Sequence, residues 1–274
     1  MTEHHFATPR PVSLYAELGR GSVTVHAVEI TESRVEVSGR DAASVRVEQE
    51  GDELLVIAPR QRTGFLGGSE SALHAVITVP TGSSLAVKSG SADVTADGTY
   101  GTCEVRSGSG DVTLAAIGAA TVETGSGDIR VDLAGRDMRV KSGSGDVTIS
   151  RADAALTVST GSGDVEVGTC QGPTVVKTGS GDVTLTDTSD DVSLSTGSGE
   201  LSITTARRGR ISIQGASSDV RIGIPEGLPV WTDIATVSGR LRSTVTGAGQ
   251  PTEGADRLEV RATTVSGDVT LAPA

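Results

Sequence analysis

Residues 142–165 read SGSGDVTISRADAALTVSTGSGDV, and they contain two copies of a phrase that returns through most of the chain. The phrase is Gly-Ser-Gly, then an acidic residue, then a β-branched or aliphatic residue. Its acidic position is occupied in turn by Asp93, Asp111, Asp128, Asp146, Asp164, Asp182, Glu200 and Asp219. Neighbouring acidic residues in this series lie 17 to 19 positions apart. A fixed period in this range is typical of a solenoid, in which each repeat forms one turn of a coil.

Apolar residues alternate with polar ones on both sides of each phrase. Val147 and Ile149 stand one and three positions after Asp146, and Leu156 and Val158 stand eight and six positions before Asp164. This period of two indicates strands with one buried and one solvated face. The strand centres lie nine residues apart. We therefore predict an all-β fold, a parallel β-solenoid with two short strands in each coil of about 18 residues.

The residue two positions after each acidic residue is expected to point outward. These residues are Thr95, Thr113, Arg130, Thr148, Glu166, Thr184, Ser202 and Arg221. Hydroxyl-bearing residues predominate among them, and threonine suits an exposed β surface. The sequence thus predicts a Ser/Thr-rich stripe along one side of the solenoid.

The N-terminal third of the chain is less regular than the rest. Residues 1–11 are expected to form a ragged polar lead. Strand-like alternation then predicts strands at 22–28, 34–39, 44–49, 53–59 and 74–80. We predict that residues 1–81 form a less regular N-terminal β cap shielding the first coil, and that residues 82–274 form the solenoid body as one continuous domain.

Three features interrupt or end the pattern. Phe65 and Leu66 stand in a Gly-punctuated loop, where they either tuck against the body or form a sticky tip for a partner. Trp231, the one tryptophan of the chain, is expected to plug the end of the core. Residues 258–271 carry one more copy of the strand–turn–strand phrase and are expected to close the stack.

Composition restricts the classes of partner. Aromatic residues make up only 2% of the chain and Gly numbers 36, which suits a narrow aliphatic core; disorder is the alternative for such a composition, and the regular alternation argues against it. The net charge of −12 argues against nucleic acid and anionic membranes as partners. Cys103 and Cys170 lie roughly three coils apart, too far for a disulfide, and are expected to fill small sites in the core or at its edge.

Targeting signals also bear on location. No apolar run reaches the roughly 18 residues of a membrane span, and the N-terminal residues MTEHHFATPRP have neither a basic n-region nor an apolar h-region. The C-terminal residues VTLAPA carry no anchor pattern. We therefore predict a cytoplasmic location, with a surface location left open.

The strand GSVTV at 21–25, followed by many SGSGDV and TGSGDV repeats, resembles the bacterial adhesin-like family of β-strand-repeat proteins, a family of unknown function. The resemblance covers roughly residues 12–271. It implies a β-repeat architecture and a role in binding, and it carries over no catalytic residue.

The aspartates of the repeat have two interpretations. They resemble part of the calcium-binding nonapeptide of β-rolls, but here the Asp directly follows the second Gly and the motif occurs once per coil. Alternatively, Gly provides a positive φ, and Asp or Ser caps N–H groups of the turn. The sequence favours capping, and a calcium-binding β-roll is the alternative.

Catalysis is poorly supported by the sequence. The four histidines, His4, His5, His26 and His74, all lie outside the repeat body, and the aromatic platforms of glycan-cleaving solenoids are almost absent. We predict no catalytic, cofactor-binding or metal-binding residue and no cofactor. The predicted function is that of a non-enzymatic structural or interaction protein that presents a Ser/Thr-rich surface to an unknown macromolecule, a protein or a cell-envelope component. The sequence does not determine the oligomeric state.

Overall fold

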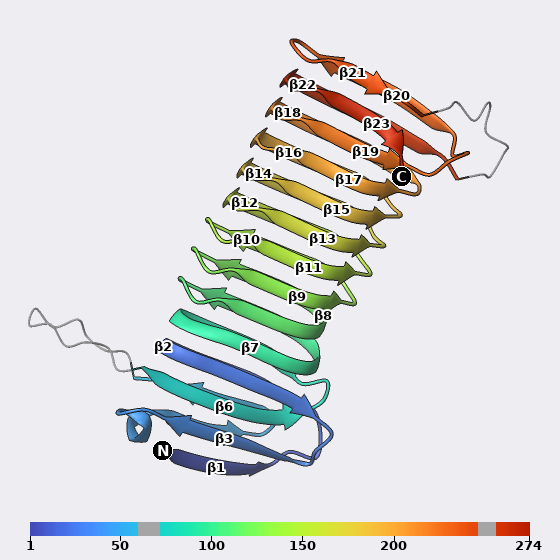
Figure 1. The fold of residues 1–274 in the computed structure, drawn as a ribbon. Helices are drawn as coiled ribbons and strands as arrows, with labels where there is room; N and C mark the ends of the chain where they lie inside the picture. Colours follow the sequence, from blue (N-terminus) through green and yellow to red (C-terminus); the bar gives the residue numbers. More distant parts are fainter. Residues whose placement is uncertain (60–71, 246–255) are drawn as a thin grey trace, which may run out of the picture. The chain divides into compact units, whose positions relative to one another are not determined.

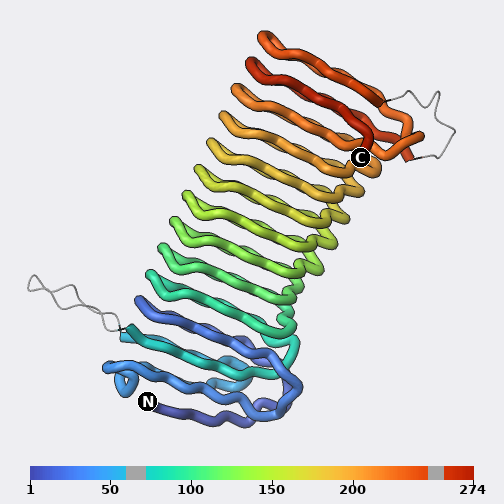
Figure 2. The backbone as a smooth tube through the Cα atoms, in the orientation of Figure 1, coloured from blue at the N-terminus to red at the C-terminus, as the bar shows by residue number. Residues whose placement is uncertain are grey.

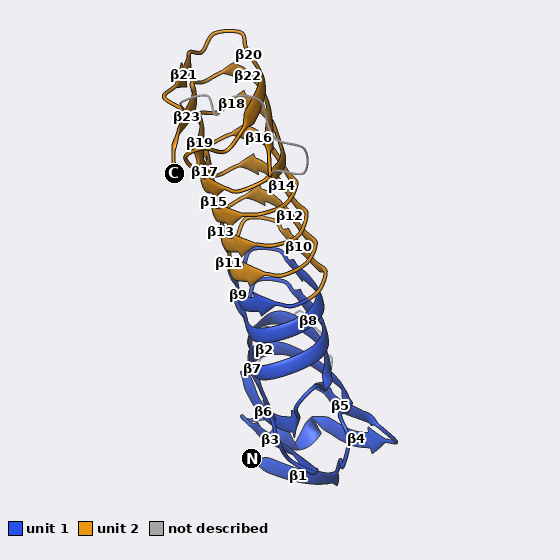
Figure 3. Ribbon diagram, turned by 90° about the vertical axis from the view of Figure 1, so that its right-hand side faces the viewer, with its two compact units in different colours: residues 1–135 blue, residues 136–274 orange. Residues whose placement is uncertain are grey.

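The computed structural model describes residues 1–59, 72–245 and 256–274 (Figure 1). These residues form 23 strands and one short 3-10 helix, η1 (Ala42–Ser44). The chain divides into two compact units, Met1–Gly135 and Arg136–Ala274 (Figure 3). The predicted all-β solenoid is confirmed within each unit. The division into residues 1–81 and 82–274 stays a prediction.

The strands of the second unit form two parallel ladders. The even-numbered ladder runs in the order β10 (Met138–Ser142), β12 (Leu156–Ser162), β14 (Thr174–Ser180), β16 (Val192–Ser198), β18 (Gly209–Ser217), β22 (Leu258–Ser266) and β20 (Val230–Thr236). The odd-numbered ladder runs β11 (Val147–Ala152), β13 (Val165–Cys170), β15 (Val183–Thr188), β17 (Leu201–Ala206), β19 (Val220–Ile224), β23 (Val269–Pro273) and β21 (Leu241–Ser243). The chain passes from one ladder to the other twice in each coil (Figure 2).

The core of this unit consists of the predicted inward positions. Val147, Ile149, Leu156 and Val158 are each 0% exposed. Val147 pairs with Val165 and Leu156 pairs with Thr174, so each inward residue stacks on the one 18 positions later. This register aligns apolar residues into continuous rows, and that alignment is what a repeat needs because it cannot bury its own apolar face.

The order of the last coils differs from the order expected from the sequence. Strands β22 and β23 pair with β18 and β19 on one side and with β20 and β21 on the other (Figure 1). The copy at 258–271 is therefore inserted beneath residues 230–243 and does not close the stack. Its inward residues are apolar, as in Val260 and Ala262, whereas β20 places Thr232 at the matching position. The copy with the more apolar inward residues, at 258–271, therefore lies where paired strands cover it on both sides.

The prediction for Trp231 is wrong. Trp231 pairs with Glu259, which is an outward position, and its side chain is 54% exposed. Its ring lies 5.5 Å from the guanidinium carbon of Arg261, a cation–π contact. The alternation along β20 gives Val230, Thr232 and Ile234 the inward positions, so the tryptophan between them must face out.

The first unit also contains parallel coils. Its strands are β1 (Thr2–Ala7), β2 (Ser13–Val28), β3 (Glu32–Ser38), β4 (Arg46–Glu50), β5 (Glu53–Ile57), β6 (Leu73–Pro80), β7 (Ser84–Ser107), β8 (Val112–Thr124) and β9 (Ile129–Ala134). Strand β2 pairs in parallel with β7 along most of its length, and β7, β8 and β9 continue the parallel pairing. Residues 13–28 thus form a coil of their own before the repeat phrase begins.

The N-terminal strands are predicted correctly from residue 22 onward, but the first eleven residues are not. Residues 2–7 are no ragged lead, because they form β1, which pairs antiparallel with β3 from Thr2–Val37 to Ala7–Glu32. The alternation of inward and outward residues in β1 is not recognisable in the sequence, because charged residues and histidines occupy much of this edge strand. Phe65 and Leu66 lie outside the described residues.

Both cysteines are free and buried, Cys103 at 3% exposure and Cys170 at 1%. Burial raises the pKa of the Cys103 thiol to about 12 and raises that of Cys170 as well. The expectation that they fill small core sites is confirmed.

Candidate functional site

The aspartates of the repeat form a ladder that joins successive coils. In the second unit, Oδ1 of Asp146 accepts the backbone N–H of Asp164 at 2.9 Å, and Oδ1 of Asp164 accepts that of Asp182 at 2.8 Å. In the first unit, the carboxylates of Asp93 and Asp111 accept the N–H groups of Asp111 and Asp128. The capping interpretation is confirmed, although the capped N–H belongs to the next coil instead of the same turn.

Hydroxyl groups close the turn itself. Ser142 Oγ accepts the N–H of Gly145 at 3.0 Å and lies 3.1 Å from the carbonyl oxygen of the same residue. Ser107 makes the same pair of contacts with Gly110. Two polar groups of each such turn are therefore satisfied locally, and the aspartate is left to bridge coils.

These contacts compete with calcium binding. One oxygen of each capping carboxylate already accepts a backbone hydrogen bond, and the described residues hold no cluster of three or more His, Cys, Asp or Glu side chains suited to a metal ion. Calcium requires six to eight oxygen ligands, of which carboxylates are the main protein source. The geometry gives no support to the β-roll alternative.

The ladder predicts how substitutions of Asp164 behave. Asp164→Asn keeps an oxygen that accepts the Asp182 N–H, so the free energy of unfolding should change by no more than about 0.5 kcal/mol. Asp164→Ala removes the acceptor and should cost about 1 kcal/mol. Millimolar calcium should leave the melting temperature of the unsubstituted protein unchanged. Urea unfolding and thermal melts measure these effects; equal loss in Asn and Ala variants, or a rise in melting temperature with calcium, would contradict capping.

The outward face of the odd-numbered ladder carries hydroxyl groups in lateral register. Thr148 pairs with Glu166, Glu166 with Thr184, and Thr184 with Ser202. Two positions farther along their strands stand the exposed residues Ser150, Thr186 and Thr204. These side chains form two adjacent rows on this face of the unit, and neighbouring strands within each row are about 4.8 Å apart. In the first unit Thr95 and Thr113 continue the same pattern.

A hollow lies beside the copy of the repeat phrase that ends at Asp219, where the Gly-Ser-Gly sequence is no longer regular. It has a volume of about 340 Å³ and is lined by Gly199, Glu200, Ser217, Ser218, Asp219, Ser266 and Gly267. Its carboxylates are engaged, since Glu200 accepts from Arg221 at 2.5 Å and Asp219 accepts the N–H of Asp268 at 2.8 Å.

The buried hydroxyl of Ser218 in this hollow has a packing explanation. Ser218 Oγ has no hydrogen-bond partner, and it lies 1.8 Å from the point where a Cβ at Gly215 would be. In the regular phrase, Ser or Thr stands at the position of Gly215, and Gly stands at the position of Ser218. The two residues have exchanged places, so the Ser218 side chain fills the space of the missing one, and its hydroxyl is no sign of a ligand.

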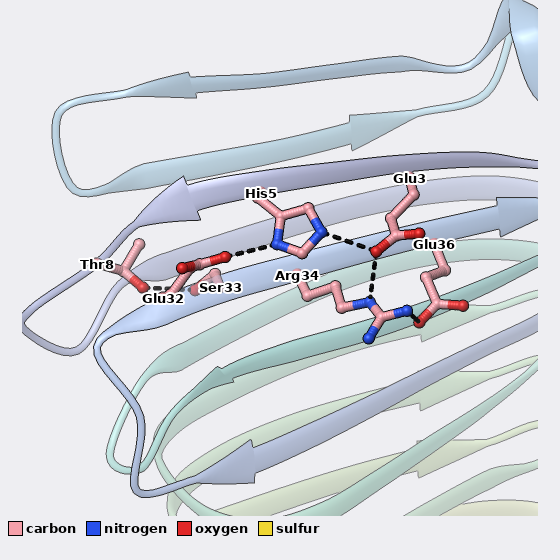
Figure 4. A network of polar contacts seen from close by, with 7 residues as sticks. All are labelled: Glu3, His5, Thr8, Glu32, Ser33, Arg34 and Glu36. Atoms are coloured by element: carbon pink, nitrogen blue, oxygen red, sulfur yellow. Dashed lines mark hydrogen bonds and ion pairs between the residues drawn. The ribbon is translucent and has the colours of Figure 1, made fainter.

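A charged network covers the first strands of the first unit (Figure 4). His5 Nε2 lies 2.7 Å from Glu3 Oε1, and His5 Nδ1 lies 2.5 Å from Glu32 Oε1. Arg34 joins Glu3 at 3.1 Å and Glu36 at 2.8 Å. The hydrogen bonds that His5 donates to Glu3 and Glu32 raise the pKa of His5, and the hydrogen bond accepted from His5 and the charge of Arg34 lower the pKa of Glu3. The network holds β1 to β3.

The attachment of β1 should depend on pH. The raised pKa of His5 contributes stability that is complete below the ordinary value of 6.5 and is lost as the pH rises through the folded value. Protection factors of the β1 amides, measured by hydrogen exchange, should therefore fall as the pH is raised from 6.5 through the raised pKa of His5. In His5→Gln they should be lower at pH 6 and should not vary over this range. A protection factor in the unsubstituted protein that is constant or rises would refute the role of His5.

Two further histidine contacts were not foreseen from the sequence. Ser22 Oγ lies 2.9 Å from His74 Nδ1, and His26 Nδ1 lies 3.4 Å from Asp97. Ser22 and His26 lie on β2, and the histidine that contacts the serine is a different one from that which contacts the carboxylate. A serine nucleophile needs one histidine that joins both groups, so these two pairs do not form a triad.

No helix among the described residues is long and apolar enough to cross a membrane.

Comparison with known proteins gives a family and a fold. The chain is similar to a solved structure provisionally described as an adhesin from Parabacteroides distasonis, with 17% identity, a TM-score of 0.52, and coverage of 81% of this chain and 96% of that one. A second protein provisionally described as an adhesin, from Parabacteroides merdae, matches with 12% identity, a TM-score of 0.47, and coverage of 98% and 95%. No curated protein matches the chain.

The sequence profile of the Toastrack family, DUF4097, matches the chain twice, at residues 17–169 and at residues 117–272. The expected relation to adhesin-like β-repeat proteins of unknown function is thereby confirmed. Since the two matches together extend from residue 17 to residue 272, the chain belongs to the Toastrack family.

Proposed function

We propose that this Toastrack chain is a non-enzymatic binding protein whose hydroxyl-bearing face contacts another macromolecule, a protein or a component of the cell envelope. The relatives with solved structures include proteins provisionally described as adhesins, and adhesion is a binding role. The partner and the face are our own proposal.

The observation that carries the proposal is the regular row of hydroxyls on the odd-numbered ladder. Thr148, Thr184 and Ser202 project from three strands in fixed register, with Glu166 between the first two. Their side chains are partly exposed, and the backbone beneath Thr184 and Ser202 is fixed by pairing on both sides. Hydroxyl groups donate and accept hydrogen bonds, and a rigid array of them loses little conformational entropy when it binds.

The proposal is tested with matched variants of the two faces. Thr148→Glu, Thr184→Glu and Ser202→Glu together place three carboxylates on the proposed face. Thr157→Glu, Ser193→Glu and Ser212→Glu place three carboxylates at outward positions of the even-numbered ladder, on β12, β16 and β18. Both triple variants should keep the circular dichroism spectrum of the unsubstituted chain, since all six positions face outward, and repulsion among Glu166 and the new carboxylates should lower the melting temperature of the odd-ladder variant by only about a few degrees.

The readout is saturable binding of the purified, labelled chain to the envelope fraction and to the soluble protein fraction of the source cell. The unsubstituted chain and the even-ladder variant should bind one of these fractions equally, and the odd-ladder variant should lose most of its binding. Equal binding by both variants, or no saturable binding to either fraction, would refute the proposed face.

We retain the cytoplasmic location as a proposal, and immunoblots of cytoplasmic and envelope fractions test it. A calcium-binding function is not favoured, because the carboxylates that would supply its ligands cap backbone N–H groups.

A further inference from the structure

At the terminal coil of the second unit, no other strand among the described residues covers the core. Strand β20 pairs only with β22, and β21 pairs only with β23, so each has one free edge among the described residues (Figure 1). The inward residue Leu241 is 53% exposed, and the inward residues Val230 and Ile234 are partly exposed. The equivalent inward residues of the coils beneath, such as Val260 and Val269, are fully buried.

Exposed apolar side chains gather at this end. Seven large apolar residues are exposed in the described part of the chain, and three of them, Trp231, Val237 and Leu241, belong to the terminal coil. A concentration of apolar surface next to free strand edges is a common mark of an interaction site.

Charge permits self-association at this end. Between residues 225 and 245, Glu226 and Asp233 are balanced by Arg240 and Arg242, so the terminal coil carries no net charge in a chain of net charge −12. Two copies that approach through other surfaces repel each other on average, whereas two terminal coils do not.

From these observations we propose that the terminal coil, β20 with β21, pairs with the same coil of a second copy of the chain. A partner must offer two strand edges at once, one for each ladder, and an apolar row between them. A single extended peptide satisfies one edge only, whereas a second terminal coil satisfies both. A two-fold axis across the end brings the edges together antiparallel, and such an interface is closed, so the product is a dimer.

The contact is small, two short strands on each side, so the affinity should be on the order of micromolar or weaker. This inference does not depend on the hydroxyl-bearing face, and either proposal can fail without the other.

Sedimentation velocity of the full chain over a wide concentration range tests the inference. The mass should rise from that of one chain, 27.7 kDa, toward twice that value as the concentration increases. Ile234→Lys and Leu241→Lys should each weaken the dimer by at least about ten-fold. Across the two-fold axis, each lysine faces either the same lysine of the second chain or the apolar row of that chain.

Val265→Lys is the matched control. Val265 is exposed at 56%, lies on β22 in the neighbouring coil, and has paired strands on both sides. This variant should dimerise like the unsubstituted chain. Melting temperatures of all three variants establish that they are folded. A mass of one chain at every concentration, growth beyond the dimer, or dimerisation unaffected by lysine at Ile234 and Leu241 would overturn the inference.

Discussion

Val147→Asp should lower the free energy of unfolding of the second unit by about 4 kcal/mol or more. The side chain of Val147 is 0% exposed and stacks on Val165 in the next coil. A carboxylate at this position is removed from water among aliphatic side chains with no cation beside it. It must either remain charged at a high cost or take up a proton, and both alternatives favour the unfolded chain.

Thr148→Asp is the matched control, because Thr148 is the adjacent residue and points to the opposite face. Its effect should stay within about 1 kcal/mol, arising mainly from proximity to Glu166. Urea unfolding followed by circular dichroism measures both variants. Equal destabilisation by the two substitutions would show that the assignment of inward and outward positions is wrong.

Gly181→Ala should be nearly as damaging, with a loss of about 3 kcal/mol or more. Gly181 has a φ of +136°, and a Cβ there would lie 2.4 Å from the carbonyl oxygen of Gly163 in the preceding coil. The close approach involves backbone atoms of a stacked coil, which cannot turn aside as the end of a side chain can. The substitution must therefore separate two coils or distort the turn.

Gly227→Ala separates the cost of the clash from the cost of the backbone angle. Gly227 also has a positive φ, +77°, but a Cβ there meets no atom within 4 Å. Its loss should be about 1 kcal/mol, as expected for alanine in a left-handed conformation alone. Thermal melts of the two variants compare these costs; a difference below about 1 kcal/mol would mean that the coils tolerate separation at their turns.

The repeat predicts the fold well because one physical requirement is repeated in every coil. Val147 and Ile149, and Leu156 and Val158, fall at inward positions because a period of two and a period of 18 together leave one register that buries apolar residues on both ladders. The position in the stack of a coil that departs from the period of 18 cannot be predicted in this way. Residues 258–271 pair beneath residues 230–243, and the insertion depends on which of two copies forms the better core.

The features of the site that could not be predicted are those that depend on contacts between distant segments. Asp164 is recognisable as a turn residue, but the N–H that it caps belongs to Asp182 and can be assigned only when the stacking is known. His5 gives no signal in the sequence, because its partner Glu32 lies 27 residues away on a strand paired antiparallel to it. Trp231, the one tryptophan of the chain, is expected from the sequence to plug the end of the core, whereas the alternation along β20 gives it an outward position.

Pulsed electron paramagnetic resonance tests whether successive repeat phrases stack as coils in lateral register, on which the core, the aspartate ladder and the hydroxyl rows all depend. Spin labels are attached to cysteines at Thr148 and Ser202 in one variant and at Thr148 and Arg221 in another, with Cys103 and Cys170 replaced by alanine. The first pair lies three coils apart and the second pair four. Stacked coils should give separations of about 14 Å and about 19 Å before the label offset, so the second distance should exceed the first by about 4.8 Å. Broad distributions, or a second distance longer by more than about twice this step, would contradict the stacked coils.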